Sequence, residues 1–186
     1  MSTDLASRQQ AAAERITAAG IFLRPDEPDQ IEIADFGLGR FEEIGLAIHV
    51  YMNTYRCCGK ELAMVPGQIC PQHLHPDIDG EPGKEETFRV RAGEVHLFVP
   101  GDDSEEAKAF AMSIVPEDKQ KTFTIYKHHH LKTGDQLTLE PNTPHWFAAG
   151  KDGAVITEFS TRSRDEYDIF VDKAIVRHND ESPHAG

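Results

Sequence analysis

Between about residue 44 and residue 160, the chain alternates short runs of strand character with clusters of turn residues. The runs are IGLAIHVYM (44–52), KELAMV (60–65), ETFRVR (86–91), EVHLFV (94–99), KTFTIY (121–126), DQLTLE (135–140) and GAVITEFS (153–160). Turn clusters such as VPGQ, DIDGEPG and EPNTP stand between them. Many short strands punctuated by Gly and Pro are typical of a β-sandwich or β-barrel. The sequence therefore predicts an all-β domain.

The two ends of the chain read differently from this strand-rich centre. Residues 6–19 are rich in Ala, Gln and Glu and are followed by Gly20, which predicts a short N-terminal helix. The segment RDEYDIFVDKAIV is consistent with a short helix or an edge strand, and the polar end RHNDESPHAG is expected to be disordered. We therefore expect an arm over residues 1–29, a barrel domain over 30–172 and a tail over 173–186.

Composition excludes several classes of partner. A formal charge of −13 argues against nucleic acid and against an anionic membrane surface, because both require a basic face. No apolar run approaches the ~20 residues of a membrane span, and the polar N-terminus does not resemble a signal peptide. Three cysteines, two of them adjacent, give no even disulfide framework. We expect reduced thiols and a cytoplasmic protein, with a Cys57–Cys70 pair or a thiolate metal ligand as the alternative.

The stretch CPQHLHPDIDGEPGKEETFRVRAGE places two histidines and a carboxylate where they can meet. Side chains two apart in a strand share a face, so His73 and His75 point the same way. In the run that follows, Glu86 shares a face with apolar residues and is expected to point inward. A buried carboxylate requires a cation or hydrogen-bond donors. The alternative is that the two histidines are solvated turn residues beside Pro71 and Pro76.

A fourth ligand is available from the segment EPNTPHWF, which presents His145 after a turn. Three imidazoles and one carboxylate suit Mn, Fe, Co, Ni or Zn and leave room for water or substrate. We therefore predict a divalent metal held by His73, His75, Glu86 and His145.

These residues resemble the two motifs of the cupin family. The first runs from Gly67 through His73-Leu74-His75 and Glu86 to Gly93, and the second from Gly134 through Pro141 to His145. Two departures indicate a subgroup. The spacer between His75 and Glu86 has ten residues where many cupins have fewer, and the second motif has Asn142 and one residue less before its histidine. The resemblance implies a cupin-type β-barrel of the jelly-roll kind.

The subgroup that the chain resembles is the D-lyxose isomerase family of cupins, over about residues 30–172. The segments that carry the likeness include the H-x-H with its long spacer to KEETFRVR, together with PHWF and EFSTRSRDE. The resemblance implies a divalent metal, commonly manganese, and a homodimer. It also implies the interconversion of D-lyxose with D-xylulose, with D-mannose and D-fructose as a second pair.

Aldose–ketose isomerisation needs polar groups beyond the metal ligands, because a proton must leave C2 and reach C1 of the sugar. Glu158 is a charge inside an apolar run, and Lys84 shares a face with Glu86, so we predict both to be catalytic. Lys60 would lie on the same strand face as Leu62 and Met64, and it is predicted to hold a substrate hydroxyl. A salt bridge for Glu158 and snorkelling surface positions for the lysines are the alternatives.

Three further residues are weaker candidates for the substrate site. Trp146 is predicted either to wall the sugar or to be an ordinary core residue. Arg162 and Asp165 are predicted to line the mouth of the barrel or to cap its end. The tract KHHH (127–130) is expected to be solvated rather than metal-binding, because consecutive residues in a strand alternate faces.

Two other functions would use the same ligands. A metal-dependent cupin dioxygenase also takes three histidines and a glutamate, and a non-catalytic cupin would hold a sugar without turnover. The charged residues Lys60, Lys84 and Glu158 favour a polyol substrate and hence the isomerase.

Overall fold

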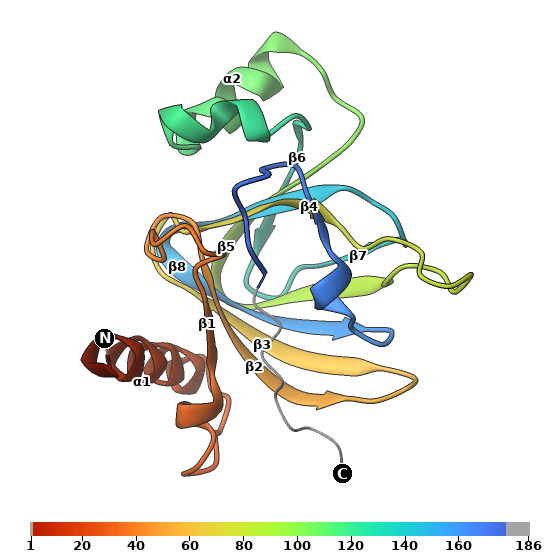
Figure 1. The fold of residues 1–186 in the computed structure, drawn as a ribbon. Helices are drawn as coiled ribbons and strands as arrows, with labels where there is room; N and C mark the ends of the chain where they lie inside the picture. Colours follow the sequence, from red (N-terminus) through yellow and green to blue (C-terminus); the bar gives the residue numbers. More distant parts are fainter. Residues whose placement is uncertain (1, 178–186) are drawn as a thin grey trace.

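The computed structural model describes residues 2–177, and the polar end that was expected to be disordered falls outside them except for Arg177. The strands form one strongly curled antiparallel sheet with the shape of an open barrel (Figure 1). They are β1 (Glu32–Ala34), β2 (Leu46–Asn53), β3 (Cys58–Met64), β4 (Ile69–Leu74), β5 (Glu86–Val99), β6 (Lys127–Lys132), β7 (Gln136–Leu139), β8 (His145–Ser160) and β9 (Ile169–Phe170). The predicted all-β barrel is confirmed.

Two long strands, β5 and β8, form the spine of this barrel. They pair with each other along most of their length, from Glu86 opposite Ser160 to Phe98 opposite Trp146. On its other edge β8 pairs first with β4 and then with β3, while β5 pairs with β7 and then with β6. Every strand that carries a predicted metal ligand or the predicted base is therefore bonded to this spine or belongs to it.

Two irregularities in the β5–β8 pairing let the spine curl. The register between β5 and β8 shifts on both sides of Gly93, and Gly93 has φ +75°. A Cβ at Gly93 would lie 2.0 Å from the carbonyl oxygen of Gly153. Only glycine permits this close approach of two backbones, and the resulting bend turns the sheet around its contents.

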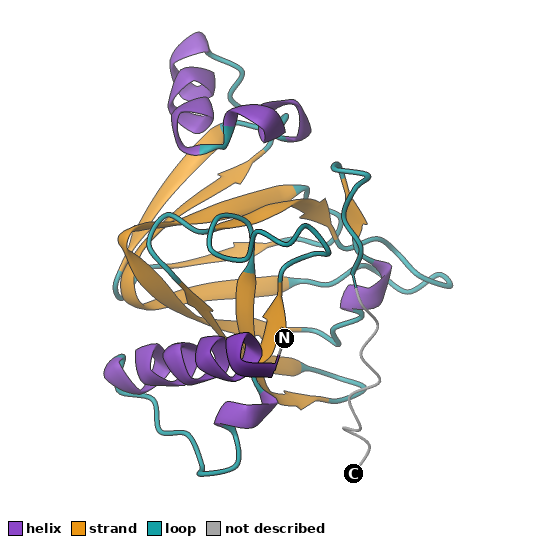
Figure 2. Ribbon diagram, turned by 60° about the vertical axis from the view of Figure 1, so that its left-hand side comes forward, coloured by secondary structure: helices purple, strands orange, loops and turns teal. Residues whose placement is uncertain are grey.

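The helices cover the outside of the barrel at opposite ends, as Figure 2 shows. Helix α1 (Ser2–Ala18) buries Ala12, Ala13 and Ile16 against Ala47 and Val155 of the sheet. Helix α2 (Glu105–Ile114) and the 3₁₀ turn η2 (Glu117–Thr122) cover the other end. Two further 3₁₀ turns are η1 (Pro28–Gln30) and η3 (Asp165–Tyr167). None of the helices in this described part of the chain combines the length and apolar character needed to cross a bilayer.

Some predicted elements are wrong in kind or extent. The run KTFTIY (121–126) is not a strand: it ends η2 and continues as extended chain, because Phe123 packs with Trp146 under α2 instead of joining the sheet. The helix α2 was missed, although Ser104 caps it by accepting a hydrogen bond from the amide of Ala107 and acidic residues follow. The segment after Arg164 holds both alternatives that were left open, the turn η3 and the short strand β9.

The described part of the predicted tail packs on the barrel. The amide of Val176 donates to the carbonyl of Phe36, and Arg177 forms an ion pair with Glu32 on β1. Among the described cysteines, all three are free thiols, with Cys57 exposed and Cys58 and Cys70 buried.

Candidate active site

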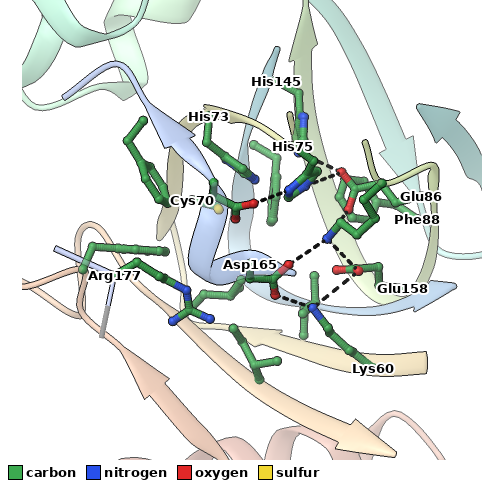
Figure 3. Close-up of a pocket in the computed structure, with 18 residues that line it drawn as sticks. Lys60, Cys70, His73, His75, Glu86, Phe88, His145, Glu158, Asp165 and Arg177 are labelled. Carbon is green, nitrogen blue, oxygen red and sulfur yellow. Dashed lines mark hydrogen bonds and ion pairs between the residues drawn. The ribbon is translucent and has the colours of Figure 1, made fainter. Parts of the chain in front are cut away.

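A pocket inside the barrel gathers the predicted metal ligands (Figure 3). His73 on β4 and His145 on β8 are directly opposite each other in the antiparallel pairing, which brings their ring centroids to 4.3 Å. The Nδ1 of His73 lies 2.8 Å from the carbonyl oxygen of Pro71, and the Nδ1 of His145 lies 2.9 Å from that of Thr143. When each Nδ1–H donates to its carbonyl, the lone pair is on Nε2, the nitrogen that a metal requires.

His75 and Glu86 complete this group. His75 lies just beyond the end of β4, and its Nδ1 is 2.5 Å from a carboxylate oxygen of Asp168. Glu86 Oε1 lies 3.1 Å from His75 Nε2 and 3.0 Å from His145 Nε2. The predicted inward direction of Glu86 is confirmed, since its side chain is 2% exposed while Glu85 is exposed. Candidate ligand atoms of the three histidines all lie within 4.8 Å of one another.

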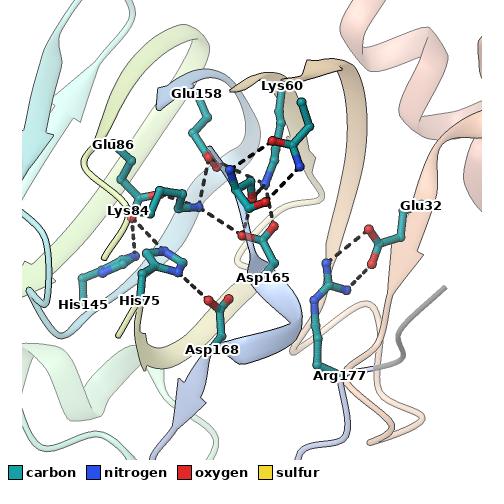
Figure 4. A network of polar contacts seen from close by, with 12 residues as sticks. Glu32, Lys60, His75, Lys84, Glu86, His145, Glu158, Asp165, Asp168 and Arg177 are labelled. Carbon is teal, nitrogen blue, oxygen red and sulfur yellow. Dashed lines mark hydrogen bonds and ion pairs between the residues drawn. The ribbon is translucent and has the colours of Figure 1, made fainter. Parts of the chain in front are cut away.

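A second group of charges adjoins the first, as Figure 4 shows. The ammonium of Lys84 lies 2.9 Å from Glu86 Oε2, 3.0 Å from Glu158 Oε1 and 3.3 Å from Asp165 Oδ1. Lys60 lies opposite Glu158 in the β3–β8 pairing, and its ammonium is 3.7 Å from Glu158 Oε1 and 2.5 Å from Asp165 Oδ2. A continuous chain of charge contacts thus runs from the histidine cluster to the opposite wall.

The electrostatics keep the carboxylates and the ammonium group of this site charged despite their burial, and keep the ring of His73 neutral. Burial disfavours the carboxylates of Glu86 and Asp165, yet the neighbouring lysine ammonium groups outweigh it and hold both pKa values well below the ordinary range. Burial also disfavours the Lys84 ammonium, but Asp165 and Glu158 raise its pKa well above normal. Burial and the two other imidazoles lower the pKa of His73 well below its ordinary value, so its ring is neutral and able to bind a metal.

The residues present fit a divalent cation. Among the described residues lining the pocket, Arg177 is neutralised by Glu32, while Lys60 and Lys84 face four carboxylates, those of Glu86, Glu158, Asp165 and Asp168. Without a metal, Glu86 and Asp168 outweigh the burial of His75 and raise its pKa to about 9, so a proton on this ring offsets part of the negative charge. With all three imidazoles neutral, the state in which they bind a metal, an excess of two negative charges would remain in the buried space, which a dication would offset. The buried Nε2 of His145 also makes no well-aligned hydrogen bond within the described chain, although Glu86 is close.

The structure brings eight of the ten predicted site residues together and leaves two apart. Trp146 is fully buried on the outer face of β8, stacked on Phe98 with centroids 3.8 Å apart, and its indole N–H donates to the carbonyl of Ile125. It is therefore the core residue of the alternative interpretation, because its neighbour His145 takes the inward position. Arg162 is exposed and lines a small adjoining hollow instead of the pocket.

Four residues in or beside the pocket were not found by sequence reasoning. Asp168 orients His75, Ser163 donates to Asp165 and accepts from Lys60 at 2.8 Å, and Arg177 borders the pocket from beyond the predicted barrel domain. Phe170 stacks on His73 with centroids 5.3 Å apart. All four lie in the segment after β8, which carries no strong periodic pattern. The acidic spacing of Asp165 and Asp168, three residues apart, was the only signal available.

Comparison with known proteins places this site in a family. Residues 30–182 match the family described as D-lyxose isomerase. The D-lyxose/D-mannose isomerase of Thermosediminibacter oceani is 46% identical over 169 residues, which cover 91% of each chain. The D-lyxose ketol-isomerase of Cohnella laeviribosi is 45% identical over 175 residues, or 94% of each chain.

Solved structures support the fold. The L-ribose isomerase of Acinetobacter sp. DL28 in complex with L-ribose superposes with a TM-score of 0.74 over 93% of each chain, at 17% sequence identity. The L-ribose isomerase of Cellulomonas parahominis, also with L-ribose, gives 0.74 over 92% of each chain at 18% identity. At this identity the likeness concerns the fold alone, and it agrees with the predicted cupin-type barrel. The family match and the relatives at 45–46% identity are stronger evidence, and they show that this chain belongs to the D-lyxose isomerase family.

Proposed function

We propose that this protein is a metal-dependent aldose–ketose isomerase that interconverts D-lyxose and D-xylulose, with D-mannose and D-fructose as a second pair. The observation that carries the proposal is the junction, inside one pocket, of a three-histidine cluster with Glu86 and a buried network of Lys60, Lys84, Glu158 and Asp165. The names of the relatives at 45–46% identity supply the substrates.

His73, His75, His145 and Glu86 would hold the cation, which we propose to be Mn²⁺, with Co²⁺, Ni²⁺, Zn²⁺ or Fe²⁺ as substitutes. When bound, the metal supplies a Lewis acid for the negative charge that develops on the sugar oxygens. Asp168 keeps His75 in the ligand orientation through its contact with Nδ1.

Glu158 is the proposed proton-transferring base. In the open-chain aldose, the C2–H bond breaks, its proton passes to the Glu158 carboxylate, and its electron pair forms the C1–C2 double bond of the enediolate as the C1 carbonyl electrons move to O1. The protonated Glu158 then delivers the proton to C1 while the C2–O2 carbonyl forms. Lys84, 3.0 Å from Glu158 and 2.9 Å from Glu86, holds the base in place and supplies the donor that moves the hydroxyl proton from O2 to O1.

Lys60 and Asp165 are the proposed substrate-binding pair at the far wall. An ammonium and a carboxylate 2.5 Å apart offer a donor and an acceptor to the hydroxyl groups of an extended sugar. Ser163 hydrogen-bonds to both and fixes their positions. We do not extend this role to Arg162 or Trp146, which lie outside the pocket lining.

The proposal is tested by loading metal-free protein with each of these five metals and assaying ketose formation from several aldopentoses and aldohexoses. Mn²⁺ with D-lyxose is expected to give D-xylulose. The proposal is contradicted if no metal supports ketose formation from any aldose. An oxygen electrode separates the dioxygenase alternative, because an isomerase works equally well without air. In a further assay, the protein is given a sugar labelled with deuterium at C2 in ordinary water. If the label stays at C2 without exchange with the solvent, a non-catalytic binder is favoured.

Two further properties remain proposals: a homodimer, which the family resemblance implies, and a cytoplasmic location. The free thiols of the described cysteines support a reducing compartment. Light scattering coupled to size exclusion gives the mass in solution, for which we expect twice that of one chain.

A further inference from the structure

A second cluster of histidines lies on the outer surface of the barrel, away from the pocket. Strands β5 and β6 pair antiparallel, with His96 directly opposite His130, and the alternation of side chains puts Glu94, His96, His128 and His130 on one face. Their neighbours Val95, Leu97 and Leu131 point into the core. The expectation that the KHHH tract is solvated was therefore incomplete, because the partner histidine on β5 could not be seen from β6 alone.

The contacts within this cluster are close. The Nδ1 of His96 and the Nε2 of His128 are 2.9 Å apart, and the Nε2 of His130 is 2.8 Å from Glu94 Oε2. The rings of His96 and His130 stack with centroids 4.8 Å apart. One ligand atom from each of Glu94, His96 and His130 lies within 4.8 Å of the others.

The surroundings hold the rings of His96 and His128 in place and keep these two rings neutral. Phe98 stacks on His128 at 5.0 Å, and Phe110 of α2, which lies over β6 in Figure 1, contacts the same ring at 4.6 Å. Burial and the neighbouring imidazoles lower the pKa of His128 to about 4 and also lower that of His96. Both rings are therefore uncharged at neutral pH, the state in which imidazole binds metal.

We propose that Glu94, His96 and His130 form a second metal site on the outer face of β5 and β6, which takes a late first-row divalent cation such as Zn²⁺. His128 is the positioning residue. When Nδ1–H of His96 donates to His128 Nε2, the lone pair of His96 is on Nε2 and the ring is oriented. Two imidazoles and a carboxylate, with water as the remaining ligand, are a known zinc donor set.

The ligand atoms must move closer to bind. Zinc bonds of about 2.0–2.2 Å place tetrahedral ligands about 3.3–3.6 Å apart, and the present atoms lie within 4.8 Å. The side chains of His130 and Glu94 are 37% and 49% exposed, so small rotations on the surface suffice without disturbing the core. This inference does not depend on the proposed catalytic function.

The test is a Zn²⁺ titration of metal-free, untagged protein, with the bound equivalents per chain measured after removal of free metal. The His96→Asn/His130→Asn double variant is expected to bind one equivalent fewer than the wild type. The matched control is His129→Asn, which removes an imidazole from the same tract on the opposite face of β6 and should bind as many equivalents as the wild type. Equal binding by the double variant and the wild type overturns the proposal, as does the same loss in the control.

A measurement on the wild type guards against misfolding of the double variant. Long-range ¹H–¹⁵N spectra report each imidazole nitrogen, and Zn²⁺ should shift those of His96 and His130 while His129 stays unchanged. Unshifted signals from His96 and His130 under saturating Zn²⁺ would overturn the assignment.

Discussion

Replacement of Glu158 by Gln tests the proposed base while preserving its shape. The amide oxygen of Gln can still accept a hydrogen bond from the Lys84 ammonium, which lies 3.0 Å from Glu158 Oε1. Lys84 also keeps Glu86 at 2.9 Å and Asp165 at 3.3 Å, so the network retains its connections. The variant is therefore expected to fold and to bind metal, but it can no longer accept the C2 proton.

The size of the loss follows from the chemistry. General acid–base catalysis contributes about 100- to 10,000-fold, which corresponds to about 2.7–5.4 kcal/mol of barrier at ~1.36 kcal/mol per tenfold. We expect that loss in kcat for D-xylulose formation, with KM changed far less, because the proposed substrate-binding residues Lys60 and Asp165 are not altered. Exchange of solvent deuterium into C2 should fall in parallel, because it reports the same proton transfer.

A matched control is Glu61 on β3, one position from Lys60, which pairs opposite Glu158 on β8. Glu61 is also buried, at 3% exposure against 4% for Glu158, but it points outward and accepts hydrogen bonds from Thr157 and Tyr51. Glu61→Gln should leave kcat near the wild-type value. Near-normal turnover and exchange by Glu158→Gln, at wild-type metal content, would refute the assignment of Glu158 as the base.

Three other outcomes are expected. Asp168→Asn should weaken metal binding about 10- to 100-fold, measured by competition with a chelating dye, because it removes the carboxylate 2.5 Å from His75; unchanged affinity would contradict the orienting role. Trp146→Phe should keep kcat/KM but lower the free energy of unfolding by about 1–3 kcal/mol, since a buried carbonyl loses its donor; a large rise in KM would show instead that Trp146 contacts the sugar. Burial raises the pKa of Asp165, but the ammonium groups of Lys60 and Lys84 lower it more, so its pKa in the folded chain lies well below the ordinary 3.8. Its contribution to stability is therefore full above about pH 4 and is lost as the pH falls further, and Asp165→Asn should flatten the acid side of a denaturation-versus-pH curve.

The cluster of candidate metal ligands was predictable because the alternation of side chains along a strand is a local rule. Two residues of spacing put His73 and His75 on one side, and the apolar partners of Glu86 gave its direction. Both predictions hold in the structure, as does the inward direction of Lys60. The position of His145 opposite His73 depends on the β4–β8 register, for which the sequence offers no local rule.

The remaining parts of the site depend on contacts between distant segments. Asp168 reaches His75 across 93 residues, and the pairing of Lys60 with Asp165 spans 105. Asp165 and Asp168 lie in the turn η3 and directly after it, where no periodicity shows which way a side chain points. Trp146 illustrates the converse. The apolar side chain of Trp146 could have packed on either face of the sheet. It points outward beneath α2 because the preceding residue, His145, points inward.

The central claim is that three imidazoles and one carboxylate from β4, β5 and β8 bind one cation inside the barrel. It is tested most directly by pulsed electron paramagnetic resonance of Mn²⁺-loaded protein carrying His96→Asn/His130→Asn, so that the outer cluster does not contribute. We expect nitrogen couplings from directly bound imidazoles that weaken when His145 is also replaced by Asn. A spectrum of hydrated Mn²⁺ without nitrogen couplings would contradict the account.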